Sequence, residues 1–136
     1  MHFNPVTLLI ILVVLILCFG LYVVFHRRQR ISAQEAKQIR KFWQEIFELR
    51  SEYPDQAVLK ADKLLDHALK QAGYTGTMGE KMKQARAVFR DNNGVWSAHK
   101  LRNRIAHEIH VKVSPIQANT ALTAFKKAFI DLGISL

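Results

Sequence analysis

The chain begins with one long apolar run and then changes to a pattern in which apolar residues recur every three or four positions. The run, residues 6–25, reads VTLLIILVVLILCFGLYVVF and contains no charged residue. A helix of that length spans about 30 Å, the thickness of the hydrocarbon core of a bilayer. MHFNP precedes the run and HRRQR follows it, whereas a signal peptide carries its positive charge before the apolar run. We therefore expect an uncleaved transmembrane helix over residues 6–26.

The positive charges beside this run predict its orientation. Arg27, Arg28 and Arg30 follow the run, and no Lys or Arg precedes it. Because the cytoplasmic flanks of membrane spans carry the excess of Lys and Arg, residues 1–5 should lie outside the cell and the rest of the chain in the cytoplasm. The three arginines belong to a basic linker, residues 27–31, and should attract anionic membrane lipids by about 1 kcal/mol each. The sequence thus predicts a single-pass protein of the cell membrane.

Residues 32–136 have the pattern of a helical bundle. Three segments begin with a capping signal, in which Ser or Thr is followed three residues later by Glu or Gln. Apolar residues then recur at spacings of three and four, as one buried face of a helix requires. The three signals are Ser32 to Glu35, Thr77 to Glu80, and Ser114 to Gln117 with Pro115 at the first helical position.

Turn residues separate these helices. Gly73 and Gly133 suit the left-handed conformation that ends many helices, and Asn92-Asn93-Gly94 is typical of a turn. No stretch alternates apolar and polar residues for long enough to predict a strand. The fold class is therefore all-α, a single N-terminal transmembrane helix followed by a bundle of about five helices. The five helices are expected over residues 33–50, 54–72, 78–89, 95–111 and 115–132.

The composition adds a strong positive charge to this bundle. The chain has 20 Lys and Arg against 11 Asp and Glu, a net charge of +9, and all of it follows residue 26. Such a domain should be attracted to polyanions, either nucleic acid or an anionic membrane surface. A generally basic, solvated surface explains the charge equally well. Cys18, the one cysteine, lies in the apolar run, which excludes an intramolecular disulfide and a Cys-based metal site.

Two further patterns are weak candidates for chemistry. The stretch GYTGTMG, residues 73–79, lacks the Gly-Lys-Ser/Thr ending of a phosphate-binding loop, so a turn and a helix cap explain it better. Asp62 and Asp66, four residues apart, have acid-base or metal-binding potential. They lie beside several basic residues, and we expect this to be a solvated, charged face of the helix. Neither pattern predicts a cofactor.

The predicted helix over residues 95–111 contains the stretch HKLRNRIAHEIH, residues 99–110. At 100° per residue, Leu101, Ile105 and Ile109 fall on one side and supply the apolar face that a bundle needs. A second side, with Arg102 next to it, gathers polar groups and is either a buried polar seam, an exposed face or a functional site. Its histidines lack Cys partners and the HExxH spacing of a zinc protease, so we predict no metal. The polar side consists of His99, Asn103, His107 and His110.

The order Arg102-Asn103-Arg104-Ile105-Ala106-His107 resembles the signature of the HEPN superfamily (higher eukaryotes and prokaryotes nucleotide-binding). That signature is an Arg, a polar residue directly after it, and a His four to six residues beyond. Two segments, LRNRIAHE and the earlier ADKLLDHALKQAG, are similar to the sequences of such domains. The resemblance covers residues 32–133. A second register, Arg104 to His110, has the same spacing, but Ile105 follows its Arg where a polar residue is expected.

The resemblance implies a metal-independent endoribonuclease that acts as a homodimer, with the motif helices of both protomers facing a shared cleft. In that case His107 is the acid-base group, Arg102 binds the phosphate and Asn103 is the orienting group. The chemistry agrees, because His exchanges a proton near neutral pH and a guanidinium binds a phosphate through two hydrogen bonds. The residues expected to bind substrate, RNA or a nucleotide, are His99, Lys100, Arg104 and His110, with Lys112 beside them.

The same resemblance leaves a second function open. Some members of the superfamily are non-catalytic, serving as the partner of a nucleotidyltransferase or as a dimerising module. The alternative is therefore a helical adaptor that binds nucleotide, RNA or a protein partner at the inner face of the membrane. A nucleotidyltransferase or an antitoxin is the partner that the resemblance implies.

Overall fold

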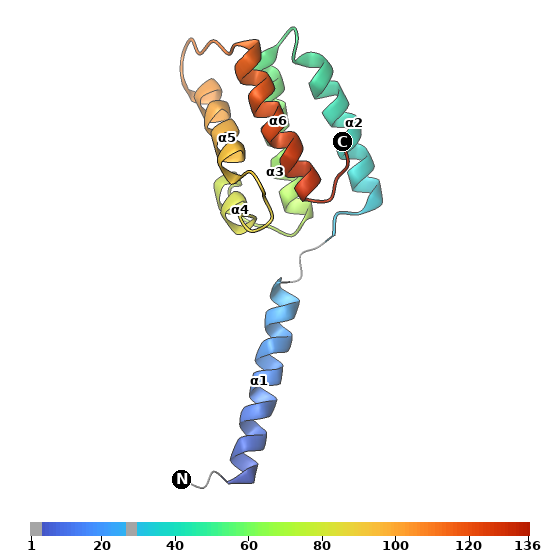
Figure 1. The fold of residues 1–136 in the computed structure, drawn as a ribbon, viewed down its shortest axis with the longest axis vertical. Coiled ribbons are helices and arrows are strands. Elements are labelled where there is room, and N and C mark those ends of the chain that lie inside the picture. The colour runs from blue at the N-terminus through green and yellow to red at the C-terminus, as the bar shows by residue number, and fades with distance from the viewer. Residues whose placement is uncertain (1–3, 27–29) are drawn as a thin grey trace.

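The computed structural model describes residues 4–26 and 30–136, with side chains described for residues 4–23 and 30–136, and every regular element in those ranges is a helix (Figure 1). This confirms the predicted fold class, an all-α chain with an apolar N-terminal helix followed by five more helices. The helices are α1 Pro5–His26, α2 Ala33–Leu49, α3 Pro54–Gln71, α4 Met78–Gln84, α5 Asn92–His107 and α6 Pro115–Asp131.

Helix α1 is long and apolar enough to cross a membrane. Its segment Pro5–Val23 has a mean hydropathy of 3.1, and the described side chains in it are exposed. No described part of α1 packs against the other helices, so its apolar surface is not part of a protein core. Of the three basic residues expected beside it, Arg30 is exposed, and Arg27 and Arg28 lie outside the described residues.

Helix α3 is the centre of the bundle, because it packs against α2, α4, α5 and α6. One apolar core joins these helices, and it includes Leu65 and Leu69 of α3 and Phe125 and Phe129 of α6. Trp43 of α2 meets the Phe129 ring edge to face, with the ring centroids 5.4 Å apart. Burial of such aromatic and aliphatic side chains is the main stabilising contribution to the bundle.

The helix ends largely follow the capping signals. The side chains of Thr77 and Ser114 accept hydrogen bonds from the backbone three residues on, and Glu80 and Gln117 complete both capping boxes. Ser32 also caps its helix, but the Glu35 side chain contacts His67 of α3 instead of closing the box. Gly73 and Gly133 have φ angles of 91° and 89°, the left-handed conformation predicted for them.

Two predicted boundaries around the fourth and fifth helices are wrong. Helix α4 ends at Gln84 rather than near residue 89, and residues 85–88 form turns. The Asn92-Asn93-Gly94 stretch, expected to be a turn, is the first turn of α5. The reason is the preceding residue, Asp91, whose side chain accepts a hydrogen bond from the Gly94 amide at 2.9 Å. An Asp at this position satisfies a free amide of the first turn and so favours starting the helix there.

Helix α5 also ends earlier than predicted, at His107 rather than near residue 111. His110 has a φ angle of 67°, in the left-handed region, so it does not continue the helix. Ile109, expected in the buried apolar face, is therefore 84% exposed. The expectation that His110 shares a helix face with His107 is wrong for the same reason.

Candidate functional site

Four side chains of α3 and α5 form a closed ring of polar contacts. Asp62 of α3 lies at its base, with Oδ1 at 2.7 Å from His99 Nδ1 and Oδ2 at 3.3 Å from Arg102 Nε. His99 Nε2 lies 3.2 Å from Asn103 Nδ2, and Asn103 Oδ1 lies 3.0 Å from an Arg102 terminal nitrogen. We call Asp62, His99, Asn103 and Arg102 the Asp62 ring.

The chemistry of these groups fixes the hydrogen positions in the Asp62 ring. Arg102 only donates, so the amide oxygen of Asn103 faces Arg102 and its nitrogen faces His99. Because an amide NH2 only donates, His99 Nε2 must accept, and because a carboxylate accepts, His99 Nδ1 must donate. The contacts are therefore satisfied together only by a neutral His99 that carries its hydrogen on Nδ1.

Asp62 is the residue whose role the sequence analysis missed. It was expected on a solvated face, but it is 3% exposed. A buried carboxylate is costly unless it is paired, and His99 and Arg102 are its partners. A signal was present in the spacing, since Asp62 follows Val58 by four residues and precedes Leu65 by three. It therefore lies on the buried face of α3.

The Asp62 ring holds Arg102 without using all of its donors. The buried Arg102 Nε has ion-pair contact with Asp62 but not the alignment of a hydrogen bond, and one terminal nitrogen bonds to Asn103. A guanidinium has five N–H groups, so donors on both terminal nitrogens remain. The Arg102 side chain is 33% exposed. It is thus a fixed cation with hydrogen-bonding capacity left for an anion.

The predicted catalytic histidine, His107, lies apart from the Asp62 ring. It is the last residue of α5, it is exposed, and among the described residues it has no hydrogen-bond or ion-pair partner. His107 follows Arg102 by five positions, which is about 7.5 Å along the helix axis and about 140° around it. Within one protomer, therefore, the structure does not bring Arg102 and His107 to one face, whereas His107 follows Asn103 by one turn.

The residues predicted to bind substrate divide between two surfaces. His99 has both ring nitrogens engaged in the Asp62 ring, so it positions its neighbours and has no free nitrogen for a ligand. His110 is exposed in the loop after α5. Lys100 and Arg104 are exposed on a different side of α5, and Arg104 Nε lies 3.5 Å from Glu108 Oε2.

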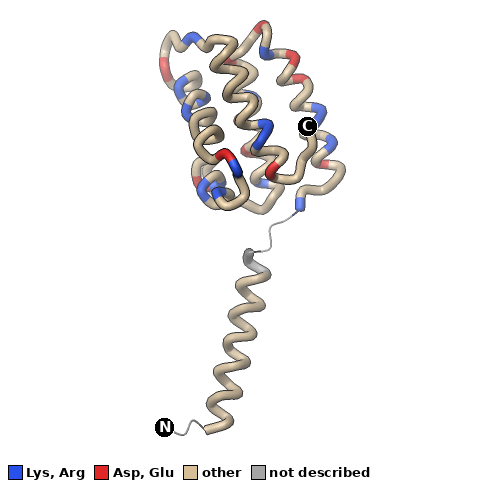
Figure 2. Tube along the Cα trace, viewed as in Figure 1, with Lys and Arg blue, Asp and Glu red and all other residues tan. Residues whose placement is uncertain are grey.

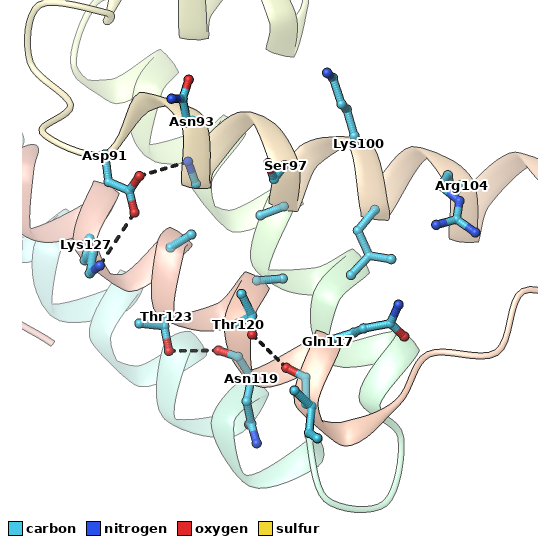
Figure 3. Close-up of a pocket in the computed structure, with 16 residues that line it drawn as sticks. Asp91, Asn93, Ser97, Lys100, Arg104, Gln117, Asn119, Thr120, Thr123 and Lys127 are labelled. Atoms are coloured by element: carbon cyan, nitrogen blue, oxygen red, sulfur yellow. Dashed lines mark hydrogen bonds and ion pairs between the residues drawn. The ribbon is translucent and has the colours of Figure 1, made fainter.

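Lys100 and Arg104 belong to the rim of a groove between α5 and α6 (Figure 3). The groove has a volume of about 980 Å³, and Leu101 lines it together with polar residues of α6. Figure 3 shows Lys100 extending from α5 away from α6, while Thr120 and Thr123 bond to the backbone of their own helix. This hollow does not include the Asp62 ring, which faces α3. This groove and the predicted catalytic residues therefore lie on different sides of α5.

The part of the chain that the structure describes contains no cluster of metal-binding side chains. No three His, Cys, Asp or Glu side chains there lie close enough together to hold one ion. His99 has Asp62 beside it, but the other imidazoles of the motif region, His107 and His110, do not join them. The polar groups that the fold does gather are a carboxylate, an amide, an imidazole and a guanidinium. They can orient an anion and its neighbours by hydrogen bonds and charge.

Comparison with protein-family models, with curated proteins and with solved structures finds no match to this chain.

Proposed function

We propose that residues 32–136 form a HEPN-like endoribonuclease that cleaves RNA without a metal, as a homodimer tethered to the membrane by α1. The observation that carries this proposal is the Asp62 ring. It uses a buried carboxylate to hold Arg102 and Asn103 at half-buried positions, and Asn103 lies one turn before the exposed His107. A helix that only packs does not need this arrangement, since a buried ion pair usually stabilises no more than apolar residues of the same volume.

Arg102 is the group that binds the phosphate. Strand cleavage places additional negative charge on the phosphate oxygens in the transition state, and a fixed guanidinium stabilises that charge best when it needs no reorganisation. The contacts with Asp62 and Asn103 supply this fixation. Arg102 also keeps the donors on its terminal nitrogens that a two-point contact to phosphate requires.

His107 is the group that moves a proton. Cleavage through the 2′-hydroxyl of RNA requires a base for that hydroxyl and an acid for the leaving oxygen, and an imidazole performs either role near neutral pH. The exposed position of His107 at the end of α5 leaves its ring open to substrate. Asn103, one turn earlier, orients the two groups relative to the substrate.

The homodimer is supported by the surface around the motif. Ile109 and Ile116, on the loop after α5 and the first turn of α6, are 84% and 79% exposed. Large apolar side chains this exposed often lie in protein interfaces. A second copy that covers them brings its own His107 and Arg102 to the same region. A shared cleft then removes the difficulty that Arg102 and His107 point to different sides of one helix.

The tether is supported by α1 and its flanks. The apolar Pro5–Val23 segment is long enough to span, and positive residues follow it. By the bias of Lys and Arg toward the cytoplasmic side, the N-terminus is outside the cell and the bundle is cytoplasmic.

The alternative, a non-catalytic adaptor of the same fold, is favoured by one observation. Asp62 neutralises much of the Arg102 charge, and each residue of the Asp62 ring contacts two others of the ring. They could therefore act only as a polar seam between α3 and α5. This function predicts a dimer that leaves RNA intact.

An Arg102→Lys substitution separates the two functions. Lysine keeps the charge but cannot make the two-point guanidinium contact. The full chain in nanodiscs is incubated with single-stranded RNA and excess chelator, beside Arg102→Lys and the control Lys60→Gln, which removes an exposed cation outside the motif. The proposal predicts cleavage by the wild type and by Lys60→Gln, and at least a 10-fold slower rate for Arg102→Lys. Intact RNA in all three samples favours the adaptor, and cleavage that chelator abolishes contradicts the metal-free mechanism.

A further inference from the structure

The end of the bundle at which α2 begins must lie near the end of α1. Only residues 27–32 separate the two helices, and six residues of extended chain reach about 20 Å at most. Four ion pairs show which other segments share this end of the bundle, because they join the start of α2, the end of α3, α4, the start of α5 and the end of α6. These pairs are Glu35 with His67, Asp66 with Lys81, Arg90 with Asp131, and Asp91 with Lys127.

The acidic residues at this end are engaged within the bundle. Four of them are the members of those ion pairs, and Asp131 also accepts a hydrogen bond from the Arg90 amide at 3.0 Å. The fifth, Glu80, accepts from the Thr77 amide in its capping box. The opposite end differs, since Glu48, Glu52 and Asp55 have no ion-pair partner among the described residues.

Four cations at the same end are exposed. Arg30 precedes α2, Lys70 lies in the last turn of α3, and Lys83 and Arg86 lie at the end of α4 and directly after it. In the described ranges none of the four has a salt-bridge partner, although Lys83 is close enough to Glu80 to help lower the pKa of that carboxyl. Figure 2 shows Lys and Arg positions around α4 at the end where α2 begins. We call Arg30, Lys70, Lys83 and Arg86 the basic end surface.

We propose that the basic end surface docks on the anionic lipid headgroups of the membrane that α1 crosses. A tether of this length keeps the surface within a few Debye lengths of the headgroups, where each unpaired Lys or Arg is attracted to anionic lipid. The sequence between α1 and this surface adds two further positive charges, Arg27 and Arg28. This proposal does not depend on RNA cleavage, but it rests on α1 as a membrane span.

Docking gives the bundle one orientation. Helix α5 starts at the basic end surface and ends at His107, so His107 lies at the end of the bundle away from the lipid (Figure 1). The loop of residues 108–114, with the exposed Ile109, lies there as well. The motif surface and its apolar neighbours therefore stay accessible to a large partner in the cytoplasm.

Site-specific quenching in nanodiscs tests this orientation. The full chain carries Cys18→Ala and one new fluorophore-labelled cysteine, at Thr75 on the side of the basic end surface or at Glu52 at the opposite end; both positions are exposed. Nanodiscs contain phosphatidylcholine alone or with about one third phosphatidylglycerol, and a small fraction of lipid has a nitroxide on its headgroup. The test variant is Lys70→Gln, Lys83→Gln, Arg86→Gln. The matched control removes three exposed cations elsewhere, Lys41→Gln, Lys60→Gln, Lys112→Gln.

The proposal predicts that phosphatidylglycerol adds an excess of quenching at residue 75 over residue 52, beyond the difference that the tether alone gives in phosphatidylcholine. The excess should fall by more than half in the test variant, or when NaCl rises from about 0.05 M to about 0.5 M, and stay unchanged in the matched control. If phosphatidylglycerol adds no such excess, or if the two triple variants lose it equally, the proposed docking is overturned and the membrane span is not. A chain that does not co-elute with nanodiscs overturns the membrane span and the docking together, while the RNA assay remains a separate test of cleavage.

Discussion

The carboxylate of Asp62, at the buried centre of α3, lies 2.7 Å from Nδ1 of His99 on α5. This contact joins the two helices at the point where the predicted catalytic motif begins. It also defines what His99 does, because its second nitrogen contacts Asn103 and leaves none for a substrate. A residue that the sequence places among the ligand-binding candidates is thus a positioning residue in the structure.

Replacing Asp62 by Asn should destabilise the bundle strongly. The substitution keeps the size of the side chain but removes the charge that balances Arg102, and an amide cannot accept through both of its polar atoms. Breaking a buried ion pair by removing one partner costs about 3 kcal/mol or more. The free energy of unfolding in urea is measured by Trp fluorescence, since Trp43 and Trp96, the two tryptophans of the chain, both lie in the bundle.

The control for that measurement is Glu45→Gln, which neutralises an exposed carboxylate on α2. It should change the free energy of unfolding by less than about 0.5 kcal/mol. If Asp62→Asn is as mild as Glu45→Gln, the Asp62 ring is not held by a buried charge.

The Asp62 ring also predicts the tautomer of His99. With Asn103 donating to Nε2 and Asp62 accepting from Nδ1, the hydrogen must be on Nδ1. Nitrogen-15 NMR of the imidazole rings near neutral pH distinguishes the two tautomers, and His107, which has no such partners, provides an internal comparison. An His99 signal with the hydrogen on Nε2 is incompatible with the ring, whereas the Asn103→Leu variant should keep the preference, because Asp62 still accepts from Nδ1.

Glu80 should make the bundle less stable in acid. The hydrogen bond from the Thr77 amide, then the Thr77 hydroxyl, and more weakly Lys83, lower the pKa of this carboxyl from its usual 4.5, against a small opposing effect of burial. A pKa that is lower in the folded state stabilises the fold above pH 4.5, and that stabilisation is lost as pH falls through the folded-state pKa. Wild type and Glu80→Gln, compared by urea unfolding, should differ at neutral pH and converge well below pH 4.5. A difference that does not change with pH contradicts this role of Glu80.

The left-handed backbone at His110 should favour glycine. At its φ of 67° a side chain meets the neighbouring carbonyl, which costs about 1 kcal/mol. His110→Gly should therefore increase the free energy of unfolding. Glycine also gives the unfolded chain more conformational entropy, which reduces this gain. His110→Ala removes the same imidazole but keeps the Cβ atom, so it should give no gain. Equal effects of the two substitutions would show that backbone strain is not involved.

The helix starts could be predicted because each depends on a few neighbouring residues. Ser32, Thr77 and Ser114 accept hydrogen bonds from amides three positions on, and a pattern of four letters contains both partners. The start of α5 was missed although its cap is local as well. Asn92 to Gly94 are common in turns and in first helical turns, and Asp91 decides between the two.

The candidate site could be predicted only in part, since its contacts come from residues far apart in the chain. The motif gave Arg102 and Asn103, but their partner Asp62 precedes His99 by 37 residues. Acidic and basic neighbours in the sequence suggested a solvated face for Asp62. The packing of α3 against α5 buries it instead. The loss of His110 from the polar side of α5 has a different cause, because a spacing argument assumes that the helix continues.

The rate of RNA cleavage by His107→Ala tests the central claim, cleavage by this motif, most directly. His107 is exposed and unpartnered in the described structure, so its removal should leave the free energy of unfolding within about 0.5 kcal/mol of wild type. Loss of an acid-base group should nevertheless slow single-turnover cleavage by about 100-fold or more. The control is His67→Ala, which removes another exposed imidazole outside the motif. The account predicts cleavage by wild type and His67→Ala and almost none by His107→Ala, all with excess chelator. Equal rates in the three proteins would contradict it.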